Sequence, residues 1–156
     1  MRNIFLVLIL LFLFVNSAFA GTVFSGQNTE VLIENSFARE SIPGTSISSA
    51  YMTISNLSAK DLRLISASST VSDRIEIHEH TMANGLMRMR QRDHVDISAK
   101  DSMLFQPSGF HLMIFDLKQP LKAKENIIIT LHFDDQPNID VNYIIKGLKQ
   151  KKHHHH

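Results

Sequence analysis

The sequence predicts a single all-β domain, an antiparallel sandwich or Greek-key barrel, and three observations lead to this expectation. After a polar leader, the chain breaks into short segments rich in Val, Ile, Thr, Phe and Tyr. Clusters of Gly, Pro, Asn, Asp and Ser separate these segments, as turns separate strands. No segment keeps the 3.6-residue apolar period of an amphipathic helix for three turns, so helical crossovers between parallel strands are not expected.

The first three expected strands follow the polar leader Gly21–Thr29. Turn signals at Ile42-Pro43-Gly44 and from Asn56 to Asp61 separate them. The three strands are Val31–Arg39, Ser48–Asn56 and Leu62–Ser68.

The Asn84-Gly85 dipeptide is the strongest hairpin signal, because both residues tolerate a positive φ. It predicts that the strands on its two sides, Arg74–Thr81 and Leu86–Arg90, pair directly. Further turn signals lie at Gln106–Gly109 and Asp135–Asn138. They bound the last three expected strands, which are Gly109–Leu117, Asn126–Phe133 and Asp140–Ile145.

The first 20 residues have the pattern of a cleaved secretory signal. Arg2 precedes an apolar run from Ile4 to Val15, and Ala18-Phe19-Ala20 forms a small-residue cleavage site. The run is shorter than the roughly 20 residues that span a bilayer. We therefore expect export with cleavage after Ala20, a folded domain over residues 21–148, a Lys- and His-rich tail over 149–156, and no membrane span in the mature protein.

Charge and composition exclude several function classes. Removing residues 1–20 takes away Arg2 and no acidic residue, which leaves 15 basic and 15 acidic side chains, so strong binding to nucleic acid is not expected. The chain has no Cys, which excludes a disulfide scaffold, a thiol nucleophile and a Cys-ligated zinc or blue-copper centre. It has no G-x-S-x-G elbow, P-loop or dinucleotide fingerprint, so no enzyme is expected.

Three of the expected strands each place His or Met on one face. Side chains alternate along a strand, so every second residue lies on the same face. One such group of His, Met and Glu lies on Arg74–Thr81 and its continuation, a second group lies on Leu86–Arg90, and a third lies on Gly109–Leu117. These groups are Glu76, His78, His80 and Met82; Met87 and Met89; and His111 and Met113. Neutral thioethers favour Cu(I), and imidazole binds copper in either oxidation state, so two His and two Met could surround a four-coordinate Cu(I) without a thiolate.

The segment from His78 to Arg90, followed by Pro107 to Lys118, resembles the periplasmic copper chaperone family PCu(A)C. The signature of that family is a His, ten residues, a Met, twenty-one residues and then His-x-Met. His78, Met89, His111 and Met113 match all four positions. The flanking phrases Gly-Leu-Met-Arg-Met-Arg, Gly-Phe-His-Leu-Met and Leu-Lys-Gln-Pro-Leu are also similar to the family.

The resemblance covers about Val31 to Ile145. It implies a cupredoxin-like barrel, a periplasmic location and a Cu(I) site formed by His78, Met89, His111 and Met113. It also implies delivery of copper towards cytochrome c oxidase. We expect a monomer that passes copper to the copper-bearing subunit of the oxidase or to another copper-assembly protein.

Several alternatives stay open at this level. His80, Met82 or Met87 could replace or supplement a ligand, and Arg88 and Arg90 could contact a partner. The four terminal His could be a purification tag or a native extension that adds Cu(II) capacity. The protein could be a periplasmic copper buffer or scavenger in copper homeostasis or resistance, or a non-metal adhesion sandwich whose Met residues fill the core. His94, in a polar segment, and His132, on a strand, have no motif support.

Overall fold

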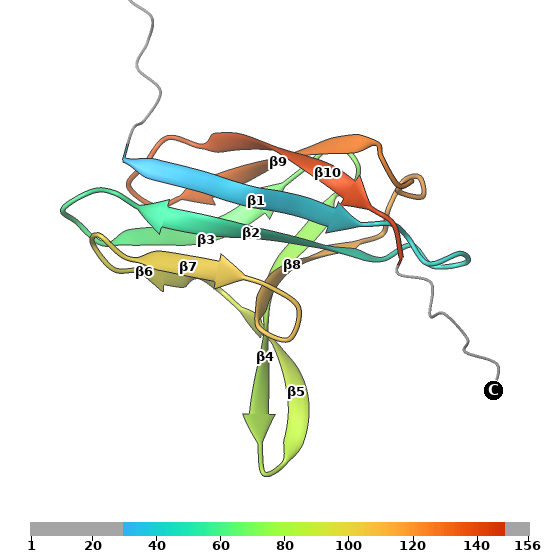
Figure 1. Cartoon of the computed structure of the whole chain (residues 1–156), viewed down its shortest axis with the longest axis horizontal. Coiled ribbons are helices and arrows are strands. Elements are labelled where there is room, and N and C mark those ends of the chain that lie inside the picture. Colours follow the sequence, from blue (N-terminus) through green and yellow to red (C-terminus); the bar gives the residue numbers. More distant parts are fainter. Residues whose placement is uncertain (1–29, 149–156) are drawn as a thin grey trace, which may run out of the picture.

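All eight strands expected from the sequence are present, and two more lie between them (Figure 1). The computed structural model describes residues 30–148, and every regular element in that range is a strand. The strands are β1 (Val31–Arg39), β2 (Ser48–Asn56), β3 (Leu62–Ser68), β4 (Arg74–Ala83), β5 (Leu86–Arg92), β6 (Val95–Ile97), β7 (Ser102–Phe105), β8 (Phe110–Phe115), β9 (Asn126–Phe133) and β10 (Ile139–Lys146).

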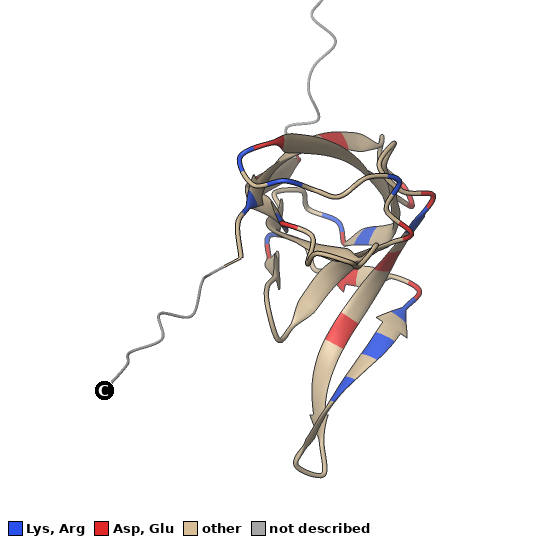
Figure 2. Cartoon of the chain, turned by 90° about the vertical axis from the view of Figure 1, so that its right-hand side faces the viewer, with Lys and Arg blue, Asp and Glu red and all other residues tan. Residues whose placement is uncertain are grey.

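The strands form one sheet that wraps around on itself, as Figure 2 shows, and the interior that it encloses is apolar. Their order is β5-β4-β8-β7-β2-β1-β10-β9-β3-β6, and β8 also pairs with β2. The expected antiparallel pairing holds except at two places, since β1 pairs with β10 in parallel and β7 pairs with β8 in parallel. The parallel pairing of β1 with β10 needs a long connection, and almost the whole domain lies between these two strands. β7 and β8 meet only at Phe105↔Phe110, because they run one after the other along β2.

The sequence analysis missed β6 and β7, which have only three and four residues. Strands this short carry too few residues to show alternation. Long-range contacts hold them in place. Asn56, which is buried at the end of β2, donates from its side-chain amide to the carbonyl of Ile97 on β6 at 3.0 Å. β7 pairs with β2 through Met52↔Phe105 and the next three residue pairs.

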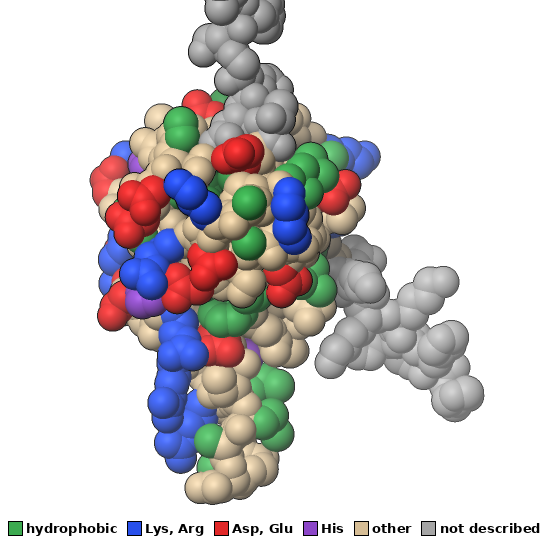
Figure 3. Space-filling view, turned by 90° about the vertical axis from the view of Figure 1, so that its left-hand side faces the viewer, with side chains coloured by type: hydrophobic (Ala, Val, Ile, Leu, Met, Phe, Trp, Pro, Cys, Tyr) green, Lys and Arg blue, Asp and Glu red, His purple; other side chains and the backbone are tan. Residues whose placement is uncertain are grey.

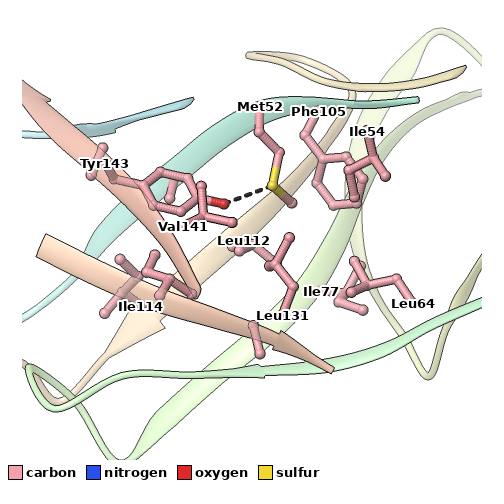
Figure 4. Close-up of a cluster of buried hydrophobic side chains, with 14 of the residues drawn as sticks. Met52, Ile54, Leu64, Ile77, Phe105, Leu112, Ile114, Leu131, Val141 and Tyr143 are labelled. Carbon is pink, nitrogen blue, oxygen red and sulfur yellow. Dashed lines mark hydrogen bonds between the residues drawn. The ribbon is translucent and has the colours of Figure 1, made fainter. Parts of the chain in front are cut away.

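The core lies between the two sides of the wrapped sheet (Figure 4). It is made largely of aliphatic side chains, with Leu112 and Ile114 of β8 fully buried against it. Tyr143 of β10 is also fully buried, and its hydroxyl donates to the Met52 sulfur at 2.6 Å. Burial raises the pKa of Tyr143, so the phenol stays neutral. Because Leu112 and Ile114 point inward, the residues that alternate with them, His111 and Met113, point to the other face of β8.

The β4–β5 hairpin extends beyond the wrapped body of the sheet (Figures 1 and 2). Asn84 and Gly85 have φ angles of 52° and 75°, which fit the two-residue turn that the sequence predicts. Every residue of β5 is exposed. Figure 3 shows basic side chains along one edge of the hairpin and hydrophobic side chains along the other. The hairpin therefore presents two chemically different faces to solvent.

The expected signal segment, residues 1–20, and the tail, residues 149–156, lie outside the described residues. Within residues 30–148, no helix has the length and apolar character needed to cross a membrane.

Candidate metal centre

The register between β4 and β8 brings the two motif histidines together. His78 lies directly opposite His111, and Glu76 lies directly opposite Met113. The His78 and His111 ring centroids are 6.0 Å apart. His78 is 8% exposed and His111 is 3% exposed, so both imidazoles are held under neighbouring side chains.

The register between β4 and β5 places the remaining motif residue on the same face. Met89 lies directly opposite His80, one step along β4 from His78 and nearer the tip of the hairpin. The next pair outward is Met82 opposite Met87. Met89 is 46% exposed, so its thioether lies at the open side of the histidine pair. All four motif residues thus share one face of the β5–β4–β8 segment, which we call the donor face.

Glu76 orients the His78 ring. Nε2 of His78 lies 2.7 Å from Oε2 of Glu76, and both side chains are largely buried. A carboxylate accepts hydrogen bonds, so Nε2 carries the proton and donates it. The lone pair of this ring is then on Nδ1, which is buried and has no hydrogen-bond partner among the described residues. Nδ1 is therefore the ring nitrogen of His78 that could hold a metal.

His111 is oriented by the backbone. Its Nδ1 lies 3.0 Å from the Gly109 carbonyl oxygen, which can only accept, so Nδ1–H donates and Nε2 holds the lone pair. Burial lowers the pKa of the His111 imidazole. The nearby His80 and His78 add to this effect, and the Gly109 hydrogen bond opposes it. The ring is consequently kept in the neutral form that a metal needs.

His80 is part of the same cluster. Its ring stacks on that of His111, with centroids 4.9 Å apart and planes at 24°. Its Nδ1 is buried and also has no hydrogen-bond partner in the described part of the chain. A buried ring nitrogen without a partner is costly, which makes His80 a stronger donor candidate than the sequence alone suggests.

Met113 lies at the opposite end of the donor face from the hairpin tip. It lines a pocket of about 410 Å³ together with Tyr51 and Ser49 of β2. Tyr51 also lies beside His111, with ring centroids 6.3 Å apart. Solvent-accessible space thus lies at both ends of the donor face.

The sequence analysis placed Glu76 on the donor face without a role, and it did not find the contributions of Gly109 and Tyr51. A carboxylate two residues before a ligand on the same strand face is a signal that could have identified Glu76. The two histidines without motif support lie elsewhere. His94 faces Asp96 at 3.5 Å, and His132 hydrogen-bonds the Ser68 hydroxyl at 2.7 Å on β3, as an ordinary strand residue does.

The donor set limits which metal this face could hold. Over residues 30–148, no group of three or more His, Cys, Asp or Glu side chains is arranged to hold a metal ion. The thioethers of Met89 and Met113 lie on the same face as the histidines and could supply further ligands. Thioether sulfur is a soft ligand that favours Cu(I) over Zn²⁺, Mg²⁺ or Ca²⁺.

Comparison with known proteins identifies the family. The LpqE-like family model matches residues 31–145. A protein of Leifsonia xyli subsp. xyli, whose name describes it as a lipoprotein, is 28% identical over 93 residues, which cover 59% of this chain and 56% of that protein. The chain spans about half the length of the curated relatives it matches.

Solved structures give the fold. The copper-bound PCuAC domain from PmoF2 is 17% identical, with a TM-score of 0.66 over 76% of this chain and 94% of that one. The CuI form of DR1885 from Deinococcus radiodurans is 26% identical, with a TM-score of 0.60 over 76% of this chain and 81% of that one. The expected all-β, cupredoxin-like fold and the resemblance to PCu(A)C proteins are confirmed. The chain belongs to the LpqE-like family and has the fold of PCuAC domains.

Proposed function

We propose that this protein is a copper chaperone that binds one Cu(I) tightly through His78, Met89, His111 and Met113. The observation that supports this most directly is the pairing of His78 with His111, whose neighbours leave one ring nitrogen of each available beside thioethers. The fold relationship to a copper-bound PCuAC domain and to the CuI form of DR1885 agrees with this function.

The arrangement suits transfer by ligand exchange. His78 and His111 are buried and fixed, whereas Met89 is half exposed on the extended hairpin. An incoming ligand can displace an exposed thioether while the two imidazoles still hold the ion. Because thioethers are neutral and need no deprotonation, their exchange requires no proton transfer. Copper stays Cu(I) throughout.

The resemblance and the family support a proposal for the place and the partner of this activity. The signal-like segment over residues 1–20 and a relative named as a lipoprotein support an exported protein, and we propose a periplasmic location. The acceptor we propose is the copper-bearing subunit of cytochrome c oxidase. The four terminal His could add Cu(II) capacity.

Transfer to the acceptor tests this function. The Cu(I)-loaded protein is mixed anaerobically with the purified copper-binding domain of the oxidase subunit, and copper in each protein is measured after chromatographic separation. In every sample His153 to His156 are replaced by Ala, so that only the domain carries copper. We expect about one equivalent to move to the acceptor. Copper that stays with its donor while remaining exchangeable with small chelators would favour the buffer function instead.

Removing the Glu76 carboxylate should weaken Cu(I) binding. Glu76→Ala leaves the His78 ring free to rotate, and loss of a partner that orients a ligand typically lowers metal affinity 10–100-fold. Glu76→Gln keeps a hydrogen-bond acceptor and should lose less. The matched control is Glu79→Ala, on the opposite face of β4, where Glu79 pairs with Arg92 at 2.8 Å. Competition with a chromophoric Cu(I) chelator measures all three. Equal affinities for Glu76→Ala and Glu79→Ala would remove the orienting role.

Cu(I) affinity should fall at acid pH, because protonation removes the lone pair that each imidazole supplies. Burial lowers the pKa of His111, so this ligand stays available to lower pH than an ordinary histidine. His78 lies directly opposite it, the His80 ring stacks on it, and the Tyr51 ring lies beside it. We expect constant affinity between about pH 8 and 7 and a decline only below the ordinary imidazole pKa of about 6.5. The measurement is the same chelator competition with the chelator's own pH dependence subtracted. Affinity that stays flat to about pH 5.5 would argue against imidazole ligands.

A further inference from the structure

The hairpin carries a row of soft donors that continues past the four proposed ligands. From the tip inward, directly opposed pairs on one face are Met82–Met87, His80–Met89 and His78–His111. Their exposure falls along this row, from 67% at Met82 and 57% at Met87 to 3% at His111. The row therefore connects solvent with the buried histidine pair.

The spacing allows a metal ion to be held at more than one place along the row. Directly opposed side chains have Cβ atoms about 5 Å apart, and successive pairs on one face of a strand are about 7 Å apart. The long, flexible Met side chains can close on an ion from both strands. The outer two pairs together supply one imidazole and three thioethers.

Two observations set these outer residues apart from ordinary surface side chains. Met82 and Met87 are large apolar side chains that lie opposite each other and are exposed, and every residue of β5 is exposed. The Nδ1 atom of His80 is buried without a hydrogen-bond partner among the described residues, although the ring stacks on His111. A metal ligated by His80 through Nδ1 would give this buried nitrogen a partner.

We propose that His80, Met82 and Met87, with Met89 shared, form a second and weaker Cu(I) position on the hairpin, through which the ion reaches and leaves the inner position. This proposal rests on the proposed function, because it extends the same donor face. Met89 lies between the two positions and can remain bound while the other ligands exchange. The ion moves with its charge unchanged, and no proton or electron is transferred between the positions.

An anaerobic Cu(I) titration with a competing chromophoric chelator tests the second position. All chains carry Ala at His153 to His156, so that the tail contributes no imidazole. The parent chain should bind two equivalents, the second at least tenfold more weakly than the first. Met82→Leu/Met87→Leu, which keeps apolar volume and removes both sulfurs, should lose the weaker equivalent and keep the tight one. His78→Ala/His111→Ala should lose the tight equivalent and keep the weaker one.

The matched control uses the other face of the hairpin. Leu86 is 61% exposed and shares its face with Arg88, so Leu86→Met adds a thioether near the tip that points away from the donor row. This variant should bind the same two equivalents as the parent. Nuclear magnetic resonance gives an independent readout, since the second equivalent should shift the His80 imidazole and the Met82 and Met87 methyl signals.

The outcomes separate this inference from the proposed function. One tight equivalent in both the parent and Met82→Leu/Met87→Leu would overturn the second position and leave the proposed function intact. Two equivalents that persist in Met82→Leu/Met87→Leu would also overturn it. Failure of the parent chain to bind any Cu(I) in competition would overturn the proposed function and the inference together.

Discussion

Replacing His111 by Ala should reduce Cu(I) affinity by more than the 10–100-fold that is typical of losing a partner of a ligand. His111 lies directly opposite His78, stacks on His80 and is 3% exposed, so its loss removes the imidazole at the centre of the histidine cluster. The hydrogen bond from Nδ1 to the Gly109 carbonyl fixes the orientation of the ring and so of Nε2. Ala removes this hydrogen bond together with the ring. Chelator competition under anaerobic conditions measures the loss.

The control for this variant is His132→Ala, which removes a strand histidine that hydrogen-bonds Ser68 away from the donor face. It should leave Cu(I) affinity unchanged. Because His111 is buried, the circular dichroism and melting temperature of His111→Ala should be compared with those of the parent. A correctly folded His111→Ala that keeps affinity within about threefold of the parent would rule out His111 as a ligand.

Replacing Phe105 by Ala should lower the free energy of unfolding by about 3–5 kcal/mol, as is typical for a large aromatic side chain in a core. Phe105 is 1% exposed and lies at the end of β7, where it pairs with both Met52 of β2 and Phe110 of β8. Its ring centroid is 5.9 Å from that of Phe110, which precedes His111. Its loss leaves a cavity beneath the strand that carries two proposed ligands.

Urea denaturation of the copper-free protein measures this effect. Leu104→Ala is the matched control, since Leu104 is the preceding residue of β7 and is 49% exposed; its cost should stay below about 1 kcal/mol. A loss below about 1 kcal/mol for Phe105→Ala would mean that β7 does not contribute to the core as the structure indicates.

Much of the fold could be predicted from the sequence, because most strands are long enough to show their pattern. β1, β2, β3 and β9 have the expected bounds, and the Asn84-Gly85 turn joins β4 to β5 as expected. The bounds of the other four expected strands differ by one to two residues at one or both ends. β6 and β7 escaped prediction, since β6 is held by pairing with β3 and by Asn56, and β7 by pairing with β2, and no local pattern reveals these contacts. The parallel pairing of β1 with β10 depends in the same way on residues far apart in the chain.

Alternation and spacing also brought the four proposed ligands to one face, but they could not give the register between strands. The structure pairs Met89 with His80 and not with His78, which extends the donor row toward the tip of the hairpin. The role of Glu76 depends on the rotamer of His78, and that of Gly109 depends on a backbone carbonyl. These contacts determine which ring nitrogen is free, and they follow from packing that the sequence pattern does not specify.

The most direct test of this account is an anaerobic Cu(I) competition titration of the chain with Ala at His153 to His156, compared with the same chain carrying His111→Ala/Met113→Ala. We expect one tight equivalent in the first protein and its loss in the second. Absence of tight binding in the first protein, or equally tight binding in both, would show that the His and Met residues of β4, β5 and β8 do not form the proposed copper site.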